Sequence, residues 1–339
     1  MNIEKDCSLR RYNTFGINAQ ADWLIHYDSV DDLRTLVRDE YFQECRLLHI
    51  GEGSNLLFLA NFHGIVLRSE IKDVELLSGS DEVVDLLVGA GLVWDDFVQY
   101  CVQRGYYGGA ENLSLVPGQV GAAAIQNIGA YGMEIERLVV AVHALHRRTG
   151  EQRIFRHEEC HYSYRHSIFK EADQADYIVT HVHFRLGKQP SYMLDYAELN
   201  KAFVGEGQQP SLEAIRELVC SVRRQKLPDV EYLGNAGSFF MNPIIRAEEA
   251  EVLLKAYPNM PHYPHEDGMV KLAAGWLIDQ CGLKGYQQGA AGVYERQALV
   301  LVNHGGATGQ DIANLAIYIQ EQVRGKFGID LQPEVRYIS

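Results

Sequence analysis

The sequence is short of positive charge and of long apolar runs, and these two deficits exclude several classes of protein. Its 339 residues include 31 lysines and arginines against 45 aspartates and glutamates, which gives a formal net charge of −14 at pH 7. Because nucleic acid and anionic lipid are themselves negative, neither is expected as the main partner. No apolar stretch is long enough to span a membrane, and residues 1–16 lack the apolar core of a secretory signal. A cytoplasmic location is therefore predicted.

Closely spaced cysteines are also absent. The six cysteines are scattered and form no C-x-x-C pair, which is typical of free thiols in a reducing compartment. Histidine and cysteine gather at 157–166, and histidine, glutamate and aspartate at 262–267. Neither group has the paired spacing of a zinc site at both ends, so we interpret them as solvated loop residues and predict no metal.

The sequence does contain a mixture of helical and strand periodicity. With 47% hydrophobic and 22% charged residues it has the composition of a globular protein, and its length favours two or three domains. Helices are predicted at 29–37, 94–105 and 311–327, and another from a capping Ser211 with inward residues up to Val222, in a region that Pro228 ends. Strands are predicted at 46–50, 56–59, 83–88, 139–145, 177–186 and 335–338. Because the two kinds do not alternate regularly, the predicted fold class is α+β.

The segment 112–133 contains no aspartate, glutamate, lysine or arginine and is crowded with glycine and alanine. Small residues let another group lie directly on backbone N–H and C=O groups. Neutral hydrogen-bonding amides are supplied by Asn112, Gln119, Gln126 and Asn127. A proline and these amides argue against a membrane helix. The composition is consistent with a shelf for a large flat polar ligand, and equally with a glycine-rich buried turn.

A second glycine-rich stretch, Gly-Glu-Gly-Ser-Asn, forms a turn at 51–55 between two predicted strands. It lacks the third glycine and the following helix of a dinucleotide-binding fingerprint, so we exclude a Rossmann site. Such a turn can present successive N–H donors to a phosphate. It can also be a bare hairpin.

Three polar residues are candidates for chemistry. Ser238 stands behind two glycines and before two aromatics, without a G-x-S-x-G elbow, which suits a structural role or a proton donor. Arg165 has aromatic and apolar neighbours, which suits a bidentate contact with a carboxylate or phosphate, or pairing with a nearby acid. Glu334 begins the last predicted strand, where a surface carboxylate is ordinary.

The order and spacing of these motifs resemble the UDP-N-acetylenolpyruvoylglucosamine reductase family, also called UDP-N-acetylmuramate dehydrogenases. The resemblance covers nearly the whole chain and is carried by residues 13–16, 51–55, 116–132, 164–165, 226–228, 234–243, 274–278, 297–300 and 333–336. Tyr196 resembles the substrate-loop tyrosine of the family's first type. The resemblance implies NADPH-dependent reduction of the enolpyruvyl ether of UDP-N-acetylglucosamine to UDP-N-acetylmuramate in peptidoglycan precursor synthesis, with FAD as cofactor.

The fold implied by this resemblance is a three-domain flavoprotein whose two-domain FAD-binding unit is of the VAO/PCMH type. The first FAD-binding subdomain would comprise 1–68, and the second 69–227 together with 329–339. A smaller α+β substrate-binding domain would comprise 228–328. The partners would be the UDP-sugar and NADPH, and the protein would be a monomer.

The resemblance also implies which residues hold FAD. Its pyrophosphate would lie on the turn at 51–55 and its ring along 117–132. The implied FAD-binding residues are Gly51, Gly53, Ser54, Asn55, Leu56, Pro117, Gly118, Gly121, Ala122, Ala124, Gln126, Asn127, Gly129 and Ala130.

Three residues are implied to be catalytic. Arg165 and Glu334 would stabilise negative charge on the substrate carboxylate, and Ser238 would deliver a proton to the carbon beside the one that receives hydride. The implied substrate-contacting residues are Tyr196, Lys226, Asn242 and Gln297. Among them, the lysine would add local positive charge to an acidic chain.

Four positions depart from the family's pattern. Glu52 stands where glycine is usual, and beside a phosphate turn it would have to point outward. Met241 replaces a lysine, Ala124 a proline and His166 an aspartate. None of these changes removes a proposed catalytic group, but those at 241 and 166 bear on the nucleotide contacts.

Two alternatives remain open from the sequence. An FAD oxidase or dehydrogenase of the same architecture could act on a hydroxy acid, and it would consume oxygen and ignore UDP-sugars. A non-catalytic module could bind the sugar nucleotide without a flavin, and it would be colourless.

Overall fold

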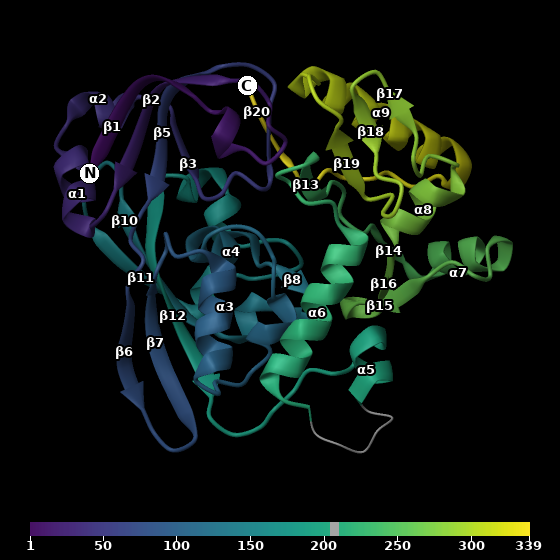
Figure 1. The fold of residues 1–339 in the computed structure, drawn as a ribbon, viewed down its shortest axis with the longest axis horizontal. Helices are drawn as coiled ribbons and strands as arrows, with labels where there is room; N and C mark the ends of the chain where they lie inside the picture. The colour runs from purple at the N-terminus through teal and green to yellow at the C-terminus, as the bar shows by residue number, and fades with distance from the viewer. Residues whose placement is uncertain (204–209) are drawn as a thin grey trace. The chain divides into compact units, whose positions relative to one another are not determined.

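The computed structural model describes residues 1–203 and 210–339, which divide into two compact units (Figure 1). Unit 1 comprises 1–7, 21–52 and 63–223, and unit 2 comprises 8–20, 53–62 and 224–339. Each unit therefore combines segments that are far apart in the sequence. Helices and strands are mixed without regular alternation, so the predicted α+β class is confirmed.

A four-stranded sheet in the order β1–β2–β5–β3 belongs to unit 1, apart from a few end residues. Its strands are β1 (Asn2–Ser8), β2 (Gln20–Tyr27), β5 (Phe62–Ser69) and β3 (Leu47–Ile50). Helix α1 (Val30–Val37) packs on it through three buried apolar side chains. The helix starts where predicted because the hydroxyl of Ser29 accepts a hydrogen bond from the Asp32 N–H at 3.1 Å. A short helix α2 (Glu40–Glu44) follows.

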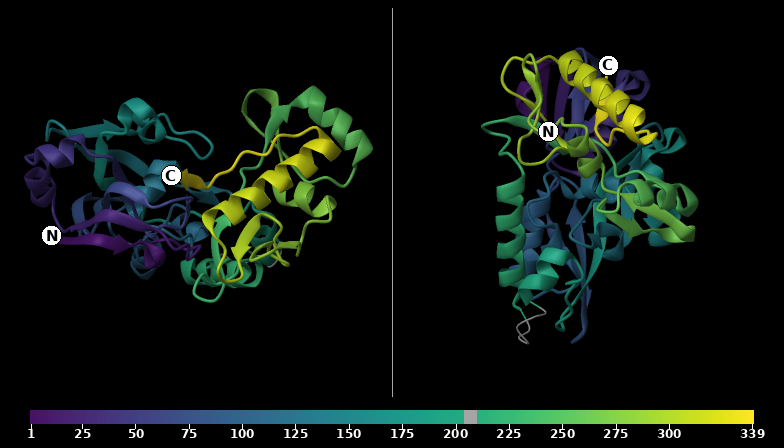
Figure 2. Two further views of the ribbon diagram at one scale, coloured as in Figure 1. Left: turned by 90° about the horizontal axis from the view of Figure 1, so that it is seen from above. Right: turned by 90° about the vertical axis from the view of Figure 1, so that its right-hand side faces the viewer.

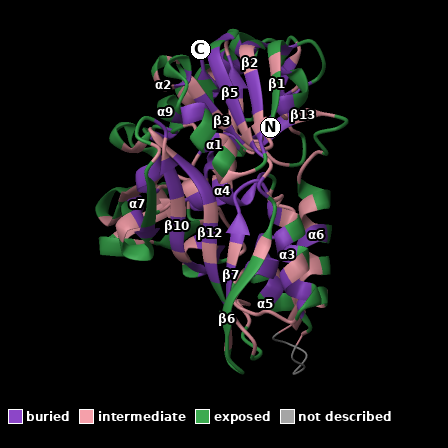
Figure 3. Cartoon of the chain, turned by 90° about the vertical axis from the view of Figure 1, so that its left-hand side faces the viewer, coloured by how far each residue is buried: buried purple, intermediate pink, exposed green. Residues whose placement is uncertain are grey.

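The larger sheet of unit 1 is antiparallel, with five strands in the order β11–β10–β12–β7–β6. They are β11 (Gln152–Arg156), β10 (Val139–His146), β12 (Tyr177–Gly187), β7 (Val83–Gly89) and β6 (Val74–Gly79). Figure 3 shows buried stretches along β10 and β12. Helix α3 (Trp94–Gln103) packs against this sheet, and the rings of Phe97 and Phe184 lie 4.9 Å apart. The apolar spacing of the helix and of β12 predicted this buried layer.

Further elements carry or adjoin candidate site residues, and they belong to unit 1 except for residues 224–226 at the end of α6, which belong to unit 2. They are the 3-10 turn η2 (Ala110–Leu113), helix α4 (Val120–Gln126), the hairpin β8 (Gly129–Ala130) and β9 (Met133–Glu134), helix α5 (Ala197–Phe203) and helix α6 (Leu212–Lys226). Helix α6 is fixed to α3 because the Arg216 guanidinium donates to both carboxylate oxygens of Asp95, each at 2.7 Å.

Unit 2 contains three small groups of strands. The first is a sheet of β13 (Gly234–Ser238), β19 (Val300–Asn303), β18 (Ala291–Val293) and β17 (Gln287–Gln288). The second is a sheet of β14 (Ile244–Arg246), β16 (Met269–Leu272) and β15 (His262–Pro264). The third is the parallel pair β4 (Leu56–Phe58) and β20 (Arg336–Ile338). Helices α7 (Ala247–Ala256), α8 (Ala274–Gln280) and α9 (Gly309–Phe327) complete the unit. The long helix α9, drawn yellow in Figure 2, packs on β18 and β19.

Two features of unit 2 bear on the sequence predictions. Helix α9 begins at Gly309, two residues earlier than predicted, because the side chains of Thr308 and Asp311 cap its first turn reciprocally. The C-terminal strand β20, which the sequence analysis grouped with 69–227, pairs with β4. The proposed three-domain boundaries remain a prediction.

None of the helices in the described part of the chain combines the length and apolar character that crossing a bilayer requires.

Candidate active site

The glycine-rich segment is not an extended shelf throughout, because residues 120–126 form helix α4. In this helix, close packing requires small residues. A Cβ atom on Gly121 would lie 2.8 Å from the Cβ of Ala90, and Ala124 has no exposed surface. Close packing of the helix on the connection between β7 and α3 therefore explains part of the composition.

Four non-glycine residues of unit 1 around this segment adopt left-handed backbone conformations. They are Leu115, Asn127, Tyr131 and Arg165, with φ between 46° and 57°. Such strain persists only where the surroundings hold it, and it gathers at functional sites. Asn127 illustrates the support: its Nδ2 donates to the Ser163 carbonyl at 2.9 Å and to the Glu134 carboxylate at 3.0 Å. Its side chain is thus committed to the protein, so any contact with a ligand would come from its backbone.

The guanidinium of Arg165 lies against the carbonyls of the glycine-rich segment. It donates to the carbonyl of Gly129 at 2.6 Å and to that of Asn127 at 3.4 Å. Gly129 makes this approach possible, since a Cβ there would lie 2.8 Å from Nη1 of the arginine. These carbonyl oxygens orient the guanidinium from the backbone of the glycine-rich segment.

In unit 2, backbone hydrogen bonds bring together three stretches that the sequence separates widely. The N–H of Glu334 donates to the carbonyl of Phe239, the neighbour of Ser238, at 2.8 Å. The side-chain amide of Asn55 donates to the Glu334 carbonyl at 3.1 Å. Ser238 itself is exposed at the end of β13. The backbones of Phe239 and Glu334 and the end of the 51–55 turn therefore lie side by side.

The other predicted substrate residues are divided between the units. Asn242 and Gln297 lie in unit 2, where their side-chain oxygens accept backbone N–H groups of Ala274 at 3.0 Å and Leu299 at 3.3 Å. Lys226 is exposed at the end of α6. In unit 1, the Tyr196 ring meets the Tyr131 ring edge-on, with centroids 5.0 Å apart.

The turn at 51–55 contains a position that only glycine can occupy. Gly53 has φ of +66°, and a Cβ there would lie 1.9 Å from the carbonyl oxygen of Tyr12. Its own carbonyl accepts the N–H of Thr14 at 3.2 Å, and the Thr14 hydroxyl is buried without a hydrogen-bond partner. A left-handed glycine beside an unsatisfied buried hydroxyl is consistent with a turn that receives a polar ligand.

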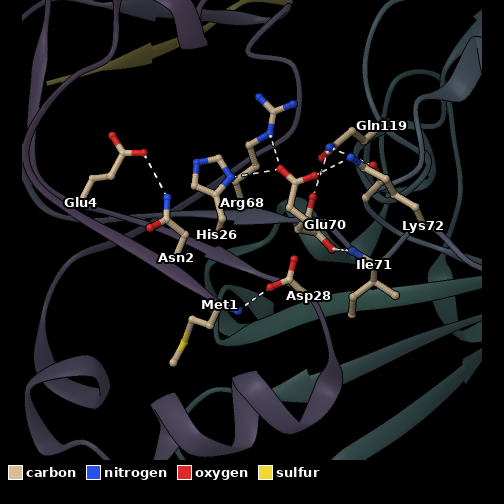
Figure 4. Close-up of polar contacts among 12 residues, drawn as sticks. Met1, Asn2, Glu4, His26, Asp28, Arg68, Glu70, Ile71, Lys72 and Gln119 are labelled. Carbon is tan, nitrogen blue, oxygen red and sulfur yellow. Dashed lines mark hydrogen bonds and ion pairs between the residues drawn. The ribbon is translucent and has the colours of Figure 1, made fainter.

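The departure at Glu52 is accommodated by pairing. Its carboxylate, about one-third exposed, accepts from the Arg68 guanidinium at 2.7 Å. Arg68 in turn lies 3.4 Å from Glu70, whose carboxylate also meets His26 and Lys72 (Figure 4). Glu52 is therefore accommodated at this turn as a member of a network of opposite charges.

The other departures make local contacts. His166 pairs with Glu171 at 3.2 Å on the surface. The backbone N–H of Met241 donates a hydrogen bond to the backbone carbonyl of Gln332 at 2.9 Å. Within residues 1–203 and 210–339 no three histidine, cysteine or acidic side chains are placed to hold a metal ion. All six cysteines are free thiols.

Glu111 directly precedes the uncharged segment, and no sequence pattern pointed to it. Its side chain is 1% exposed, and both carboxylate oxygens are buried without a hydrogen-bond partner. Burial raises the pKa of this carboxyl to about 7. No local pattern distinguishes it from a surface glutamate, because the residues that bury it come from α3 and from the loop after β12.

Comparison with known proteins supplies the family. A model described as "FAD binding domain" matches residues 21–155, and one described as "UDP-N-acetylenolpyruvoylglucosamine reductase, C-terminal domain" matches 228–338. Proteins named UDP-N-acetylenolpyruvoylglucosamine reductase from Porphyromonas gingivalis and Bacteroides fragilis are 56% and 48% identical over 338 and 336 residues, covering 100% and 99% of this chain and 100% of each relative. A crystal structure of the reductase (MurB) from Thermus caldophilus, 24% identical, has a TM-score of 0.70 with 100% of both chains covered.

These matches and the α+β fold define a flavoprotein oxidoreductase with an FAD-binding domain. The structural likeness to the Thermus caldophilus protein supports the fold. More narrowly, the chain belongs to the UDP-N-acetylenolpyruvoylglucosamine reductase family, the FAD-dependent enzymes of peptidoglycan precursor synthesis. The hydroxy-acid oxidase alternative is not favoured, because the reductase C-terminal domain and full-length relatives of that name both match.

Proposed function

We propose that the protein reduces the enolpyruvyl ether of UDP-N-acetylglucosamine to UDP-N-acetylmuramate with NADPH as reductant. Family membership supports this reaction, and the observation that carries the chemistry is the local arrangement of Ser238 and Glu334 through the backbone of Phe239. The proposal places the reaction in the cytoplasm, in agreement with six free thiols, and takes the protein as a monomer. Size-exclusion chromatography tests this oligomeric state.

The residues of this chain have distinct tasks in the proposal. Arg165, held by the Gly129 carbonyl, would bind the substrate carboxylate and stabilise negative charge as it develops there. Glu334 would assist at the same carboxylate as a neutral acid or through hydrogen bonding. Ser238 would hold the proton for the carbon beside the reduced one, since a hydroxyl stays protonated at neutral pH. Tyr196, Lys226, Asn242 and Gln297 would bind the sugar nucleotide.

FAD supplies hydride transfer when bound. The turn from Gly51 to Leu56 would hold its pyrophosphate, which agrees with the left-handed Gly53 and the unpartnered hydroxyl of Thr14. The ring would be received by Pro117, Gly118, Ala122, Gln126, Asn127, Gly129 and Ala130, with Gly121 and Ala124 shaping the segment from within. The division into 1–68, 69–227 with 329–339, and 228–328 belongs to the same proposal.

The first test is a visible absorption spectrum. The purified protein should be yellow, NADPH should bleach it under anaerobic conditions, and the enolpyruvyl sugar nucleotide should restore the colour with formation of UDP-N-acetylmuramate. Oxygen consumption with hydroxy acids and indifference to the sugar nucleotide would contradict the proposal. Colourless protein that binds the UDP-sugar would contradict it too.

Gly129→Ala is expected to impair the step that involves the substrate carboxylate. The new methyl group would meet the Arg165 guanidinium at 2.8 Å and displace it. Misplacing an aligned group by about 1 Å costs roughly 10²-fold in rate. Stopped-flow absorbance should therefore show that the return of colour with the sugar nucleotide slows more than the bleaching by NADPH does, since Gly129 is also proposed to contact the flavin ring. Equal slowing of the two steps would argue against a role for Gly129 in seating Arg165.

A further inference from the structure

The side chain of Asn112 joins two segments that are distant in the sequence. Its Nδ2 donates hydrogen bonds to the backbone carbonyl of Tyr131 at 2.9 Å and to that of Met193 at 2.8 Å. Asn112 has no exposed surface, and its Oδ1 is buried without a hydrogen-bond partner. Both N–H groups of one amide are therefore committed to carbonyls 19 and 81 residues away.

The two segments lead to the Tyr131 and Tyr196 rings. Tyr131 sits in the β8–β9 hairpin of the glycine-rich segment, in a left-handed conformation with φ of 49°. Met193 lies in residues 188–196, here called the tyrosine loop, which connect β12 to α5 without helix or strand and end at Tyr196. The Tyr131 and Tyr196 rings meet edge-on at 5.0 Å.

A second contact at the same turn supports this arrangement. Gly109, immediately before η2, is packed so closely that a Cβ there would lie 2.8 Å from Sδ of Met133 and 3.1 Å from Cγ of Met193. The turn that carries Asn112 is thus in contact with the hairpin and with the tyrosine loop by packing as well as by hydrogen bonds. All of these residues lie within unit 1.

We propose that Asn112 is a positioning residue for substrate binding: it fixes the tyrosine loop on the glycine-rich segment and so holds Tyr196 ready for the sugar nucleotide. The inference rests on the proposed role of Tyr196. It goes beyond that role by assigning the order of the loop to one amide that touches neither substrate nor cofactor. A loop without its own ladder of backbone hydrogen bonds would otherwise have to be ordered when the substrate binds, which weakens binding.

The test compares Asn112→Leu, which keeps the size of the side chain and removes both donors, with Ser114→Ala. The control removes a buried hydrogen bond of the same turn, from the Ser114 hydroxyl to the Glu111 carbonyl at 2.6 Å, and leaves the tyrosine loop untouched. Because two buried carbonyls lose their partner, Asn112→Leu should raise the KM for the enolpyruvyl sugar nucleotide about tenfold. The rate constant for flavin bleaching at saturating NADPH should stay near the wild-type value. Ser114→Ala should keep the wild-type KM.

Two further measurements separate positioning from general damage. Amide hydrogen exchange of residues 188–196 should accelerate in Asn112→Leu and not in Ser114→Ala, a readout that requires no turnover. In a Tyr196→Ala background, Asn112→Leu should raise KM no further, since the two changes remove one effect. If Asn112→Leu is poorly folded, Asn112→Ser keeps one donor and should give an intermediate KM and intermediate exchange.

The inference is overturned by an unchanged KM in folded Asn112→Leu, by equal slowing of the two half-reactions, or by fully additive effects with Tyr196→Ala. Failure of the proposed function gives a different result, because the wild-type flavin would then not be reoxidised by the sugar nucleotide at all. In that case, unchanged hydrogen exchange in residues 188–196 of Asn112→Leu would still refute the proposal that Asn112 fixes the tyrosine loop.

Discussion

Replacing Ser238 by alanine is expected to slow reoxidation of the reduced flavin by the enolpyruvyl sugar nucleotide by about 10²–10⁴-fold, the usual contribution of a positioned proton donor. Ser238 is exposed at the end of β13, while the following Phe239 and Phe240 are buried. The change therefore removes a hydroxyl without opening a cavity. Bleaching by NADPH should keep its wild-type rate, because that step needs no proton from this residue. Stopped-flow absorbance of each half-reaction measures the difference.

Two variants sharpen this prediction. Ser238→Thr keeps a hydroxyl at the same position and should lose far less activity than the alanine variant. Glu334→Gln should also act selectively on the second half-reaction, since the carboxyl is proposed to assist at the substrate carboxylate. Normal turnover in Ser238→Ala would remove the serine from the mechanism, and equal loss in the two half-reactions of Glu334→Gln would remove the glutamate.

Glu111→Gln is expected to make the protein more stable at pH 8 than the wild type by about 3 kcal/mol, and about equally stable near pH 4.5. Burial raises the pKa of Glu111 from its usual 4.5 to about 7. Between these values the unfolded chain releases the proton and the folded chain keeps it, so the free energy of unfolding falls as pH rises. Glutamine resembles the protonated acid and has no such dependence.

Urea unfolding of the two proteins at intervals from pH 4.5 to 8 measures this effect. Other titrating groups contribute equally to wild type and variant, so the difference between their free energies of unfolding isolates Glu111. The groups near this carboxyl are the Cys101 thiol on α3 and the Tyr192 hydroxyl in the tyrosine loop. A difference that stays constant over the whole pH range would show that Glu111 ionises in the folded protein as it does in the unfolded chain.

Much of the secondary structure could be predicted because its signals are local. Helix α1 follows from a capping serine and three apolar residues at helical spacing, and the buried face of β12 follows from alternation. The helix in the glycine-rich segment was not predicted. Its small residues looked suited to a ligand, and only the closeness of Gly121 to Ala90 explains why they pack as a helix.

The candidate site could be predicted in its residue types and only partly in its arrangement. Motif order pointed to Arg165, Ser238 and Glu334, which stay proposals. Their support in the fold was not visible from the sequence. The carbonyl of Gly129 orients Arg165 from 36 residues away, and the amide of Asn55 reaches Glu334 across 279 residues.

The sequence by itself determined the acidic charge, the α+β class, the position of most long elements and the family to which the chain belongs. These properties depend on composition, local periodicity and motif order. Only the tertiary structure decided that Glu111 is buried without a partner, that Asn112 bonds to carbonyls of two distant segments, and that β20 pairs with β4. The physical reason is that burial and hydrogen-bond partners are set by residues tens to hundreds of positions away, which no local pattern records.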